Sequence, residues 1–193
     1  MQNTGFSACC DFPPVREAEL FGKRVRVKNY ICSLNGGAYR PKPDRIRLQV
    51  SILLTGFCDA RCPFCIAAPT TDETTLEPSQ LERALAILKQ EDCVRGISIT
   101  GGEPFSRPEL LNRAISMIFE VFGTGMEVSL NTNGTGLGLL PKIRDLSHVD
   151  AIHVSRHHWD DDRNNAVFGR DMPSAAQLKA WIGATGWKDL FVM

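Results

Sequence analysis

The chain has 193 residues, which is enough for one domain with a buried hydrophobic core. Its 22 basic and 22 acidic residues balance, so no field of one sign attracts nucleic acid or an anionic membrane surface. The hydrophobic content of 43% is ordinary for a soluble globular protein, and no apolar run is long enough to cross a bilayer. The first residues lack the basic start and apolar run of a secretory signal, and we therefore expect a cytoplasmic protein.

The seven cysteines are an odd number and are unevenly distributed. A secreted disulfide scaffold would space them more evenly, whereas clustered cysteines in a reducing compartment more often bind metal or take part in redox chemistry. Three of them fall within residues 58–65. Cys9, Cys10 and Cys32 could bind an auxiliary cluster, although their spacing matches no established metal-binding pattern. Cys93 is expected to pack as a small hydrophobic side chain.

Residues 1–45 form a leader of mixed character with a possible short hairpin. Residues 23–28 alternate basic and apolar side chains, a pattern typical of a half-exposed strand. The Asn-Gly-Gly sequence at 35–37 indicates a turn, and the Pro-Lys-Pro sequence at 41–43 indicates a boundary. We therefore predict a separate core over residues 46–193.

Within this core, strands alternate with helices. The apolar patterns predict strands over 46–54, 96–100, 126–130 and 151–155, and a fifth strand beginning at Leu190. Helices are expected from Pro78, after a Ser106–Glu109 capping box, around 137–146, and over 173–183. This alternation favours a parallel sheet with right-handed crossovers, whose chemistry gathers at the carboxyl ends of its strands.

A cysteine loop follows the first strand of the core. Cys58, Cys62 and Cys65 are spaced as C-x3-C-x2-C. An iron–sulfur cube normally takes four cysteine ligands, one per iron, so three local thiolates would leave one iron open to a substrate or cofactor. A structural zinc site takes four ligands, often as two paired spacings, and the sequence has no second pair. A zinc knuckle and metal-free reduced thiols remain alternative interpretations.

Four sequence elements now point to one family. They are the cysteine loop with Phe64 directly before its third cysteine, Gly-Gly-Glu-Pro at 101–104, Asn-Thr-Asn-Gly at 131–134, and Ser155 with Arg156 after the fourth strand. Over roughly residues 45–193 the chain resembles the radical S-adenosylmethionine (SAM) superfamily. The resemblance implies an α/β fold, a parallel partial (β/α) barrel of the radical SAM type, here truncated after about four and a half units.

The resemblance also implies cofactors. In this family, the amino and carboxylate groups of SAM chelate the open iron of a [4Fe–4S] cluster. Reduction of the cluster cleaves SAM to a 5′-deoxyadenosyl radical, which abstracts a hydrogen atom from the substrate. The metal ligands implied are Cys58, Cys62 and Cys65. The SAM-binding residues implied are Phe64, Gly101, Gly102, Glu103, Asn131, Asn133, Ser155 and Arg156.

The local chemistry is consistent with these assignments. Gly101 and Gly102 lack a Cβ atom, so their backbone can come close to a ligand. Glu103 could accept hydrogen bonds from the ammonium group of SAM, and Arg156 could pair bidentately with its carboxylate. Phe64 would place apolar surface near the adenine.

Further polar residues cluster after the fourth predicted strand. His153 lies within that strand, where a hydrogen-bonded core histidine is expected. One of His157 and His158 could face the substrate cavity, because adjacent side chains diverge. The three aspartates at 160–162 are interpreted as a solvated loop rather than a metal site.

Three functions are consistent with the sequence. The first is a radical SAM enzyme that acts on a small molecule or peptide with a reductant such as flavodoxin or ferredoxin. The second is an activating subunit that places a glycyl radical on a partner enzyme. The third is a non-catalytic iron–sulfur or zinc module. The units are fewer than the family usually has, so the chain could be a fragment, a truncated gene product, or a half that a partner chain completes. No residue pattern marks the substrate.

Overall fold

The structure is a computed structural model that describes residues 16–20, 23–27, 48–65, 74–91, 94–185 and 190–192. The chain divides into two compact units, Met1–Leu48 and Gln49–Met193. The cysteines at positions 9, 10, 32 and 93, and the predicted turn and boundary at 35–37 and 41–43, lie outside the described residues.

The first unit contains an antiparallel hairpin. Strand β1 (Arg16–Leu20) pairs with strand β2 (Lys23–Val27), with Leu20 opposite Lys23. Strand β2 covers most of the segment in which basic and apolar residues alternate. The division between leader and core at residue 45 stays a prediction.

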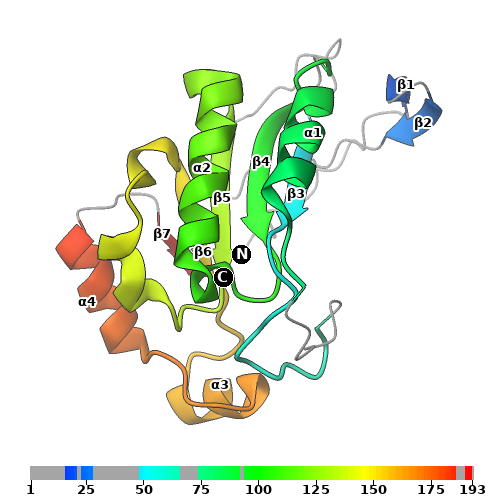
Figure 1. The fold of residues 1–193 in the computed structure, drawn as a ribbon. Helices are drawn as coiled ribbons and strands as arrows, with labels where there is room; N and C mark the ends of the chain where they lie inside the picture. The colour runs from blue at the N-terminus through cyan, green and yellow to red at the C-terminus, as the bar shows by residue number, and fades with distance from the viewer. Residues whose placement is uncertain are drawn as a thin grey trace, which may run out of the picture. The chain divides into compact units, whose positions relative to one another are not determined.

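The second unit is built on a sheet whose described strands follow one another in sequence order (Figure 1). These strands are β3 (Leu48–Leu53), β4 (Val94–Thr100), β5 (Glu127–Thr132), β6 (Ala151–Val154) and β7 (Leu190–Val192). Strands β4 to β7 pair in parallel. The Leu54 amide donates to the Thr100 carbonyl at 2.8 Å, so the carboxyl ends of β3 and β4 meet. The predicted α/β fold with a parallel sheet is confirmed.

Helices fill the connections between these strands. The α-helices are α1 (Pro78–Leu88), α2 (Pro108–Phe122), α3 (Asp161–Phe168) and α4 (Ala175–Thr185). Short 3-10 helices are η1 (Pro104–Ser106), η2 (Gly123–Gly125), η3 (Leu137–Lys142) and η4 (Leu146–His148). Helices α1 and α2 pack against each other and cover the same face of β4 and β5 (Figure 1). Among the described residues, no helix has both the length and the apolar character that a membrane span requires.

The hydrophobic core lies between these helices and the sheet. Its fully buried side chains include Leu81, Leu85, Leu111, Ile115 and Ile118 from the helices and Ile97, Ile99, Leu130 and Ile152 from the strands. Each such burial stabilises the fold by about 1.5–3 kcal/mol before the entropy of ordering is counted. This core holds the carboxyl ends of the strands in fixed positions.

Three predicted elements differ from those observed. Helix α2 begins at Pro108, not at a capping box, because the Ser106 hydroxyl donates to the Glu103 carbonyl (2.6 Å) within η1. The helix expected around 137–146 is instead the two short helices η3 and η4, and η3 contains Pro141, which cannot donate a helical hydrogen bond.

The aspartates at 160–162 do not form a solvated loop but begin helix α3. The Asp160 side chain accepts a hydrogen bond from the Arg163 amide at 3.0 Å, and Asp161 and Asp162 lie in the first turn. Acidic side chains are favourable there because the amides at a helix N-terminus are unpaired and carry partial positive charge.

Candidate functional site

The cysteine loop follows β3 at the carboxyl edge of the sheet. Cys58, Cys62 and Cys65 are free thiols and partly buried. Burial raises the pKa of Cys58 above its ordinary value, and the charges of Asp59, Glu103 and Cys62 raise this pKa further. Burial also raises the pKa of Cys62, with a further contribution from Cys65. The Cys65 amide donates to the Cys62 carbonyl at 3.2 Å, and the side chains of Cys58 and Cys62 pack against the same apolar group, so the three thiols lie close together on one loop.

The described residues contain no group of three or more His, Cys, Asp or Glu side chains that converge as the ligands of a single metal ion would. A [4Fe–4S] cluster makes a different demand, because each thiolate binds a separate iron at a corner of a cube. Three neighbouring thiols on one loop could bind three of the four irons and leave the fourth open.

The Gly-Gly-Glu turn after β4 packs directly on the cysteine loop. The Gly102 amide donates to the Thr55 carbonyl at 2.7 Å, and the Glu103 amide donates to the Phe57 carbonyl at 2.8 Å. A Cβ atom on Gly101 would lie 2.5 Å from the Thr55 carbonyl oxygen, and one on Gly102 would lie 2.0 Å from that of Phe57. The close approach that requires glycine here is therefore to the chain's own backbone.

The Glu103 carboxylate is buried and fully engaged within the chain. Its side chain is 1% exposed. Oε1 accepts hydrogen bonds from the Phe105 amide (3.0 Å) and the Thr132 hydroxyl (2.8 Å), and Oε2 accepts one from the Asn133 amide (2.7 Å). Burial raises the pKa of Glu103 to about 7, although these hydrogen bonds favour the charged form. The carboxylate thus joins the turn after β4 to the turn after β5.

Asn133 connects the second of these turns to the cysteine loop. Its Oδ1 accepts hydrogen bonds from the Thr135 amide (2.9 Å) and hydroxyl (2.7 Å). Its Nδ2 donates to Asp59 Oδ1 at 2.8 Å and lies 3.9 Å from the Cys58 sulfur. The structure therefore places Asn133 beside a predicted metal ligand.

Asn131 makes its contacts within the sheet. Its Nδ2 donates to the Ser98 hydroxyl at 2.6 Å, and its Oδ1 lies 3.1 Å from Nδ1 of His153. These three side chains lie on the adjacent strands β4, β5 and β6. His153 is thus a hydrogen-bonded histidine of the sheet, as its position in the sequence indicates.

Of the predicted pair after β6, Ser155 contacts the end of β5 and Arg156 contacts helix α3. The Ser155 amide donates to the Thr132 carbonyl at 2.8 Å. The Arg156 guanidinium forms an ion pair with Asp161 and donates to the carbonyls of Trp159 (3.2 Å) and Pro173 (3.3 Å). The hydrogen bond from Arg156 lowers the pKa of Asp161. Arg156 therefore anchors α3 in this structure.

The Gly-Gly-Glu turn forms one wall of the site, and the segment 157–172 forms a second. Of this second wall the sequence indicated only that His157 or His158 could face the cavity. The Arg61 amide donates to the Phe168 carbonyl at 2.8 Å. Phe168 packs with Ala60 and Met172, and the side chains of Cys58 and Cys62 pack against this group. Gly169 ends α3 in the left-handed conformation with φ of 69°. An Asp N-cap followed by such a glycine was the available signal for this helix.

His157 extends this wall to the exposed aromatic of the cysteine loop. Its ring contacts Phe64 edge-on at 4.7 Å between centroids and lies 5.0 Å from the Phe168 ring. The Phe64 side chain remains 54% exposed. His158 instead accepts a hydrogen bond from the Asp160 amide through Nδ1 at 2.9 Å.

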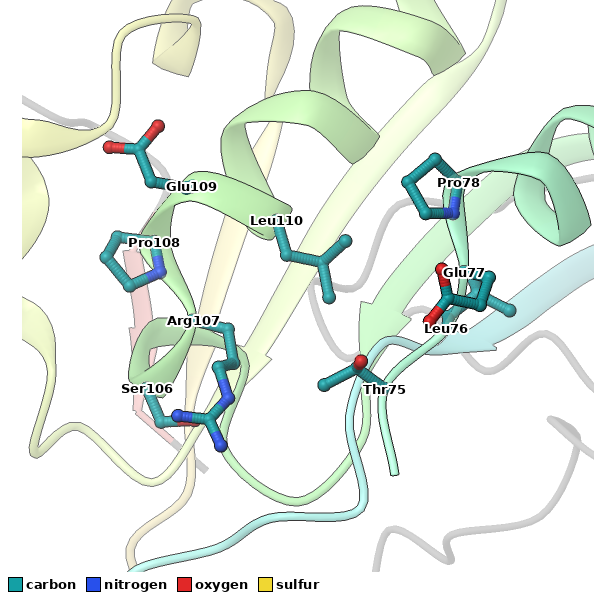
Figure 2. A pocket seen from close by; sticks show the side chains of 9 residues that line it. All are labelled: Thr75, Leu76, Glu77, Pro78, Ser106, Arg107, Pro108, Glu109 and Leu110. Carbon is teal, nitrogen blue, oxygen red and sulfur yellow. The ribbon is translucent and has the colours of Figure 1, made fainter. Parts of the chain in front are cut away.

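Two cavities open near the carboxyl edge of the sheet. The larger, of about 450 Å³, lies between the first turns of α1 and α2, with Pro78 on one side and Leu110 on the other (Figure 2). The smaller, of about 280 Å³, is lined in part by Thr55, Gly101 and Gly102. The described residues that line these cavities include no cysteine, so neither cavity contains the thiol site.

Comparison with known protein families identifies the family to which the chain belongs. Residues 52–181 match the family model described as the radical SAM superfamily. The chain belongs to this superfamily. The predicted membership of this superfamily is thereby confirmed, as are a [4Fe–4S] cluster and SAM as the cofactors of the family. The roles assigned to the cysteine loop and the turns stay predictions.

Two relatives and one solved structure illustrate the similarity. The chain is 31% identical over 123 residues to a probable GTP 3′,8-cyclase of Thermoplasma volcanium (63% of this chain, 36% of that protein). It is 28% identical over 177 residues to a GTP 3′,8-cyclase of Corynebacterium glutamicum (81% and 46%). Streptococcus suis SuiB bound to S-adenosylmethionine matches with a TM-score of 0.57 and 21% identity (76% and 33%). The chain spans less than half the length of each of these proteins.

Proposed function

We propose that this chain holds a [4Fe–4S] cluster on Cys58, Cys62 and Cys65 and serves as the radical-generating part of a radical SAM enzyme. When bound, the cluster would pass one electron from a reductant to SAM, giving methionine and a 5′-deoxyadenosyl radical that takes a hydrogen atom from the substrate. The observation that carries the proposal is the set of three neighbouring, partly buried thiols on a loop at the carboxyl edge of the sheet.

The protein's own contribution is to hold this loop rigidly from two sides. On one side the Gly102 and Glu103 amides bind its backbone, and on the other the Phe168 carbonyl accepts from Arg61. The Ala60 amide lies 3.4 Å from the Cys58 sulfur and can donate to it. N–H groups aimed at a sulfur favour the thiolate, which is the form that binds iron.

For SAM, we propose a binding surface that begins at Phe64 and follows the carboxyl ends of β4, β5 and β6. Phe64 offers an exposed ring beside the thiols. In this arrangement Glu103 supports the site by joining two turns, since its three hydrogen bonds lie within the chain. Direct contacts from Gly101, Gly102, Glu103, Asn131, Asn133, Ser155 and Arg156 stay predictions.

Anaerobic reconstitution tests the proposal. The full chain is supplied with iron and sulfide, reduced with dithionite, mixed with SAM, and assayed for 5′-deoxyadenosine. We expect about four irons per chain and formation of this product. The Cys62→Ala variant should lose cluster and product together, whereas Cys93→Ala, which changes a cysteine outside the loop, should keep both. Iron retained by Cys62→Ala at the wild-type level contradicts the ligand assignment, and a well-formed cluster without product favours a non-catalytic module.

The relatives suggest which substrate to test first. Both are named GTP 3′,8-cyclases, and we propose a purine nucleoside triphosphate as the substrate class. With the reconstituted chain, GTP should increase 5′-deoxyadenosine formation more than CTP does. Equal rates with and without GTP contradict this choice while leaving SAM cleavage unaffected.

A further inference from the structure

An ion pair reaches the cysteine loop from the end of helix α3. Nη1 of Arg170 lies 2.5 Å from Oδ2 of Asp59 and 3.2 Å from the Asp59 carbonyl oxygen. The two side chains are 38% and 27% exposed. The residue directly after the first cysteine is therefore fixed, through both side chain and backbone, by a cation from a distant part of the chain.

The other oxygen of the same carboxylate fixes Asn133. Nδ2 of Asn133 donates to Oδ1 of Asp59 at 2.8 Å and lies 3.9 Å from the Cys58 sulfur. An amide NH₂ has two hydrogens, so one can point at each of these acceptors. The amide cannot turn over without loss, because its Oδ1 already accepts two hydrogen bonds from Thr135.

We propose that Arg170, Asp59 and Asn133 form a relay of positioning residues that sets the reduction potential of a cluster held by Cys58. Arg170 holds and neutralises Asp59, Asp59 orients the Asn133 amide, and the amide N–H points at the cysteine sulfur. The inference rests on the proposed function, since it requires that Cys58 binds the cluster.

The physical basis is the charge that reduction adds. Hydrogen bonds to the sulfurs and nearby charges are among the factors that set the potential of an iron–sulfur cluster. A cation or an N–H donor favours the reduced, more negative state, and a carboxylate opposes it. Arg170→Gln leaves the Asp59 charge unpaired and should lower the potential. Asp59→Asn removes that charge, keeps Arg170, and should raise it.

The experiment is a redox titration of the full reconstituted chain, followed by electron paramagnetic resonance. At a fixed poise near the wild-type midpoint, the ratio of reduced to oxidised cluster should fall about two- to fivefold in Arg170→Gln and rise by a similar factor in Asp59→Asn. The double variant Asp59→Asn/Arg170→Gln should lie near the wild type. Asn133→Ala should lower the ratio. Arg163→Gln, which removes the same charge from an exposed position of α3, is the matched control.

Opposite shifts distinguish this relay from a purely structural role, which would move the potential in no consistent direction. Shifts of the same sign in Arg170→Gln and Asp59→Asn, or shifts no larger than that of Arg163→Gln, overturn the inference. If Arg170→Gln forms no cluster, the double variant decides: a recovered cluster supports the relay and continued loss overturns it. Failure of the wild-type chain to bind a cluster instead contradicts the proposed function.

Discussion

The two walls that hold the cysteine loop are built differently. On the side of Gly102 and Glu103, the contacts to the loop are backbone hydrogen bonds, and the buried Glu103 carboxylate joins this turn to the next. On the side of segment 157–172, a backbone hydrogen bond from Arg61 to Phe168 is joined by an apolar packing group around Phe168 and the partly exposed Arg170–Asp59 ion pair. The first wall depends on the absence of side-chain volume, and the second depends on its presence. Substitutions that add or remove volume should therefore separate them.

The largest effect is expected where volume is removed from the second wall. Phe168→Ala deletes a ring that is 2% exposed, and it should lower the free energy of unfolding by about 3–5 kcal/mol. Urea denaturation followed by circular dichroism measures this change. Trp159→Ala, which removes an 83% exposed ring from the same segment, should change the free energy by no more than about 0.5 kcal/mol. A loss in Phe168→Ala as small as that expected for Trp159→Ala would contradict the packing of Phe168 against the loop.

On the first wall, added volume should be the damaging change. Gly102→Ala brings a Cβ atom to 2.0 Å from the Phe57 carbonyl oxygen, and neither backbone can move freely. We expect destabilisation of about 3 kcal/mol and a clear loss of bound iron after reconstitution. Gly138→Ala is the control, since a Cβ atom there meets nothing within 4 Å. Normal iron content in Gly102→Ala would contradict the close packing of the turn on the loop.

A smaller effect is expected from the carboxylate that joins the two turns. Glu103→Gln sets an NH₂ group against one of three donors, which should cost about 1–3 kcal/mol of stability at pH 5. Urea denaturation of the apo-protein, compared with that of Glu82→Gln at an exposed position of α1, measures the cost.

The pH dependence of this difference has a definite sign. The pKa of Glu103 rises from 4.5 to about 7 on folding, so the folded state binds the proton more tightly than the unfolded state. The stability that this residue contributes is full below pH 4.5 and is lost as the pH rises through 7. The difference in the free energy of unfolding between the wild type and Glu103→Gln should therefore shrink as the pH rises from 4.5 to about 7. If this difference in the free energy of unfolding grew with pH, the fold would favour the charged carboxylate.

The smallest effect is expected at the surface of the second wall. Asp161→Asn removes the partner of Arg156 and should lower stability less than the preceding variants, because Asp161 is exposed to solvent. Since Asp161 has a lowered pKa, this loss should be present near neutral pH and should disappear as the pH falls through the folded-state pKa. Asp162→Asn is the control in the same helical turn. A loss as large as that of Gly102→Ala would contradict this ranking.

The sequence was informative wherever a local pattern determined the structure. The alternation of apolar residues identified the strands of the second unit, and the spacing of Cys58, Cys62 and Cys65 identified the loop. Proline at the first position of α1 also marked its start correctly. These features depend on neighbours within a few residues, which a single sequence displays.

The sequence was less informative where partners are distant. The acidic run at 160–162 looked like a solvated loop, because its role as the start of α3 depends on a helix that lacks a strong apolar stripe. For Arg156 the sequence showed a cation at the edge of the sheet but not its partner Asp161. For Gly101 and Gly102 it did not show the close approach of the Thr55 and Phe57 carbonyls. Contacts of these three residues with SAM stay predictions.

By itself, then, the sequence determined the family, the parallel β/α order and the three thiols, because periodicity and close spacing are properties of a continuous stretch of chain. Only the tertiary structure decided what surrounds the thiols. Asn133 and Arg170 lie 74 and 111 residues from Asp59 along the chain and meet it only after the sheet and α3 have formed. Contacts between residues so far apart are set by how the elements pack, and no local pattern encodes them.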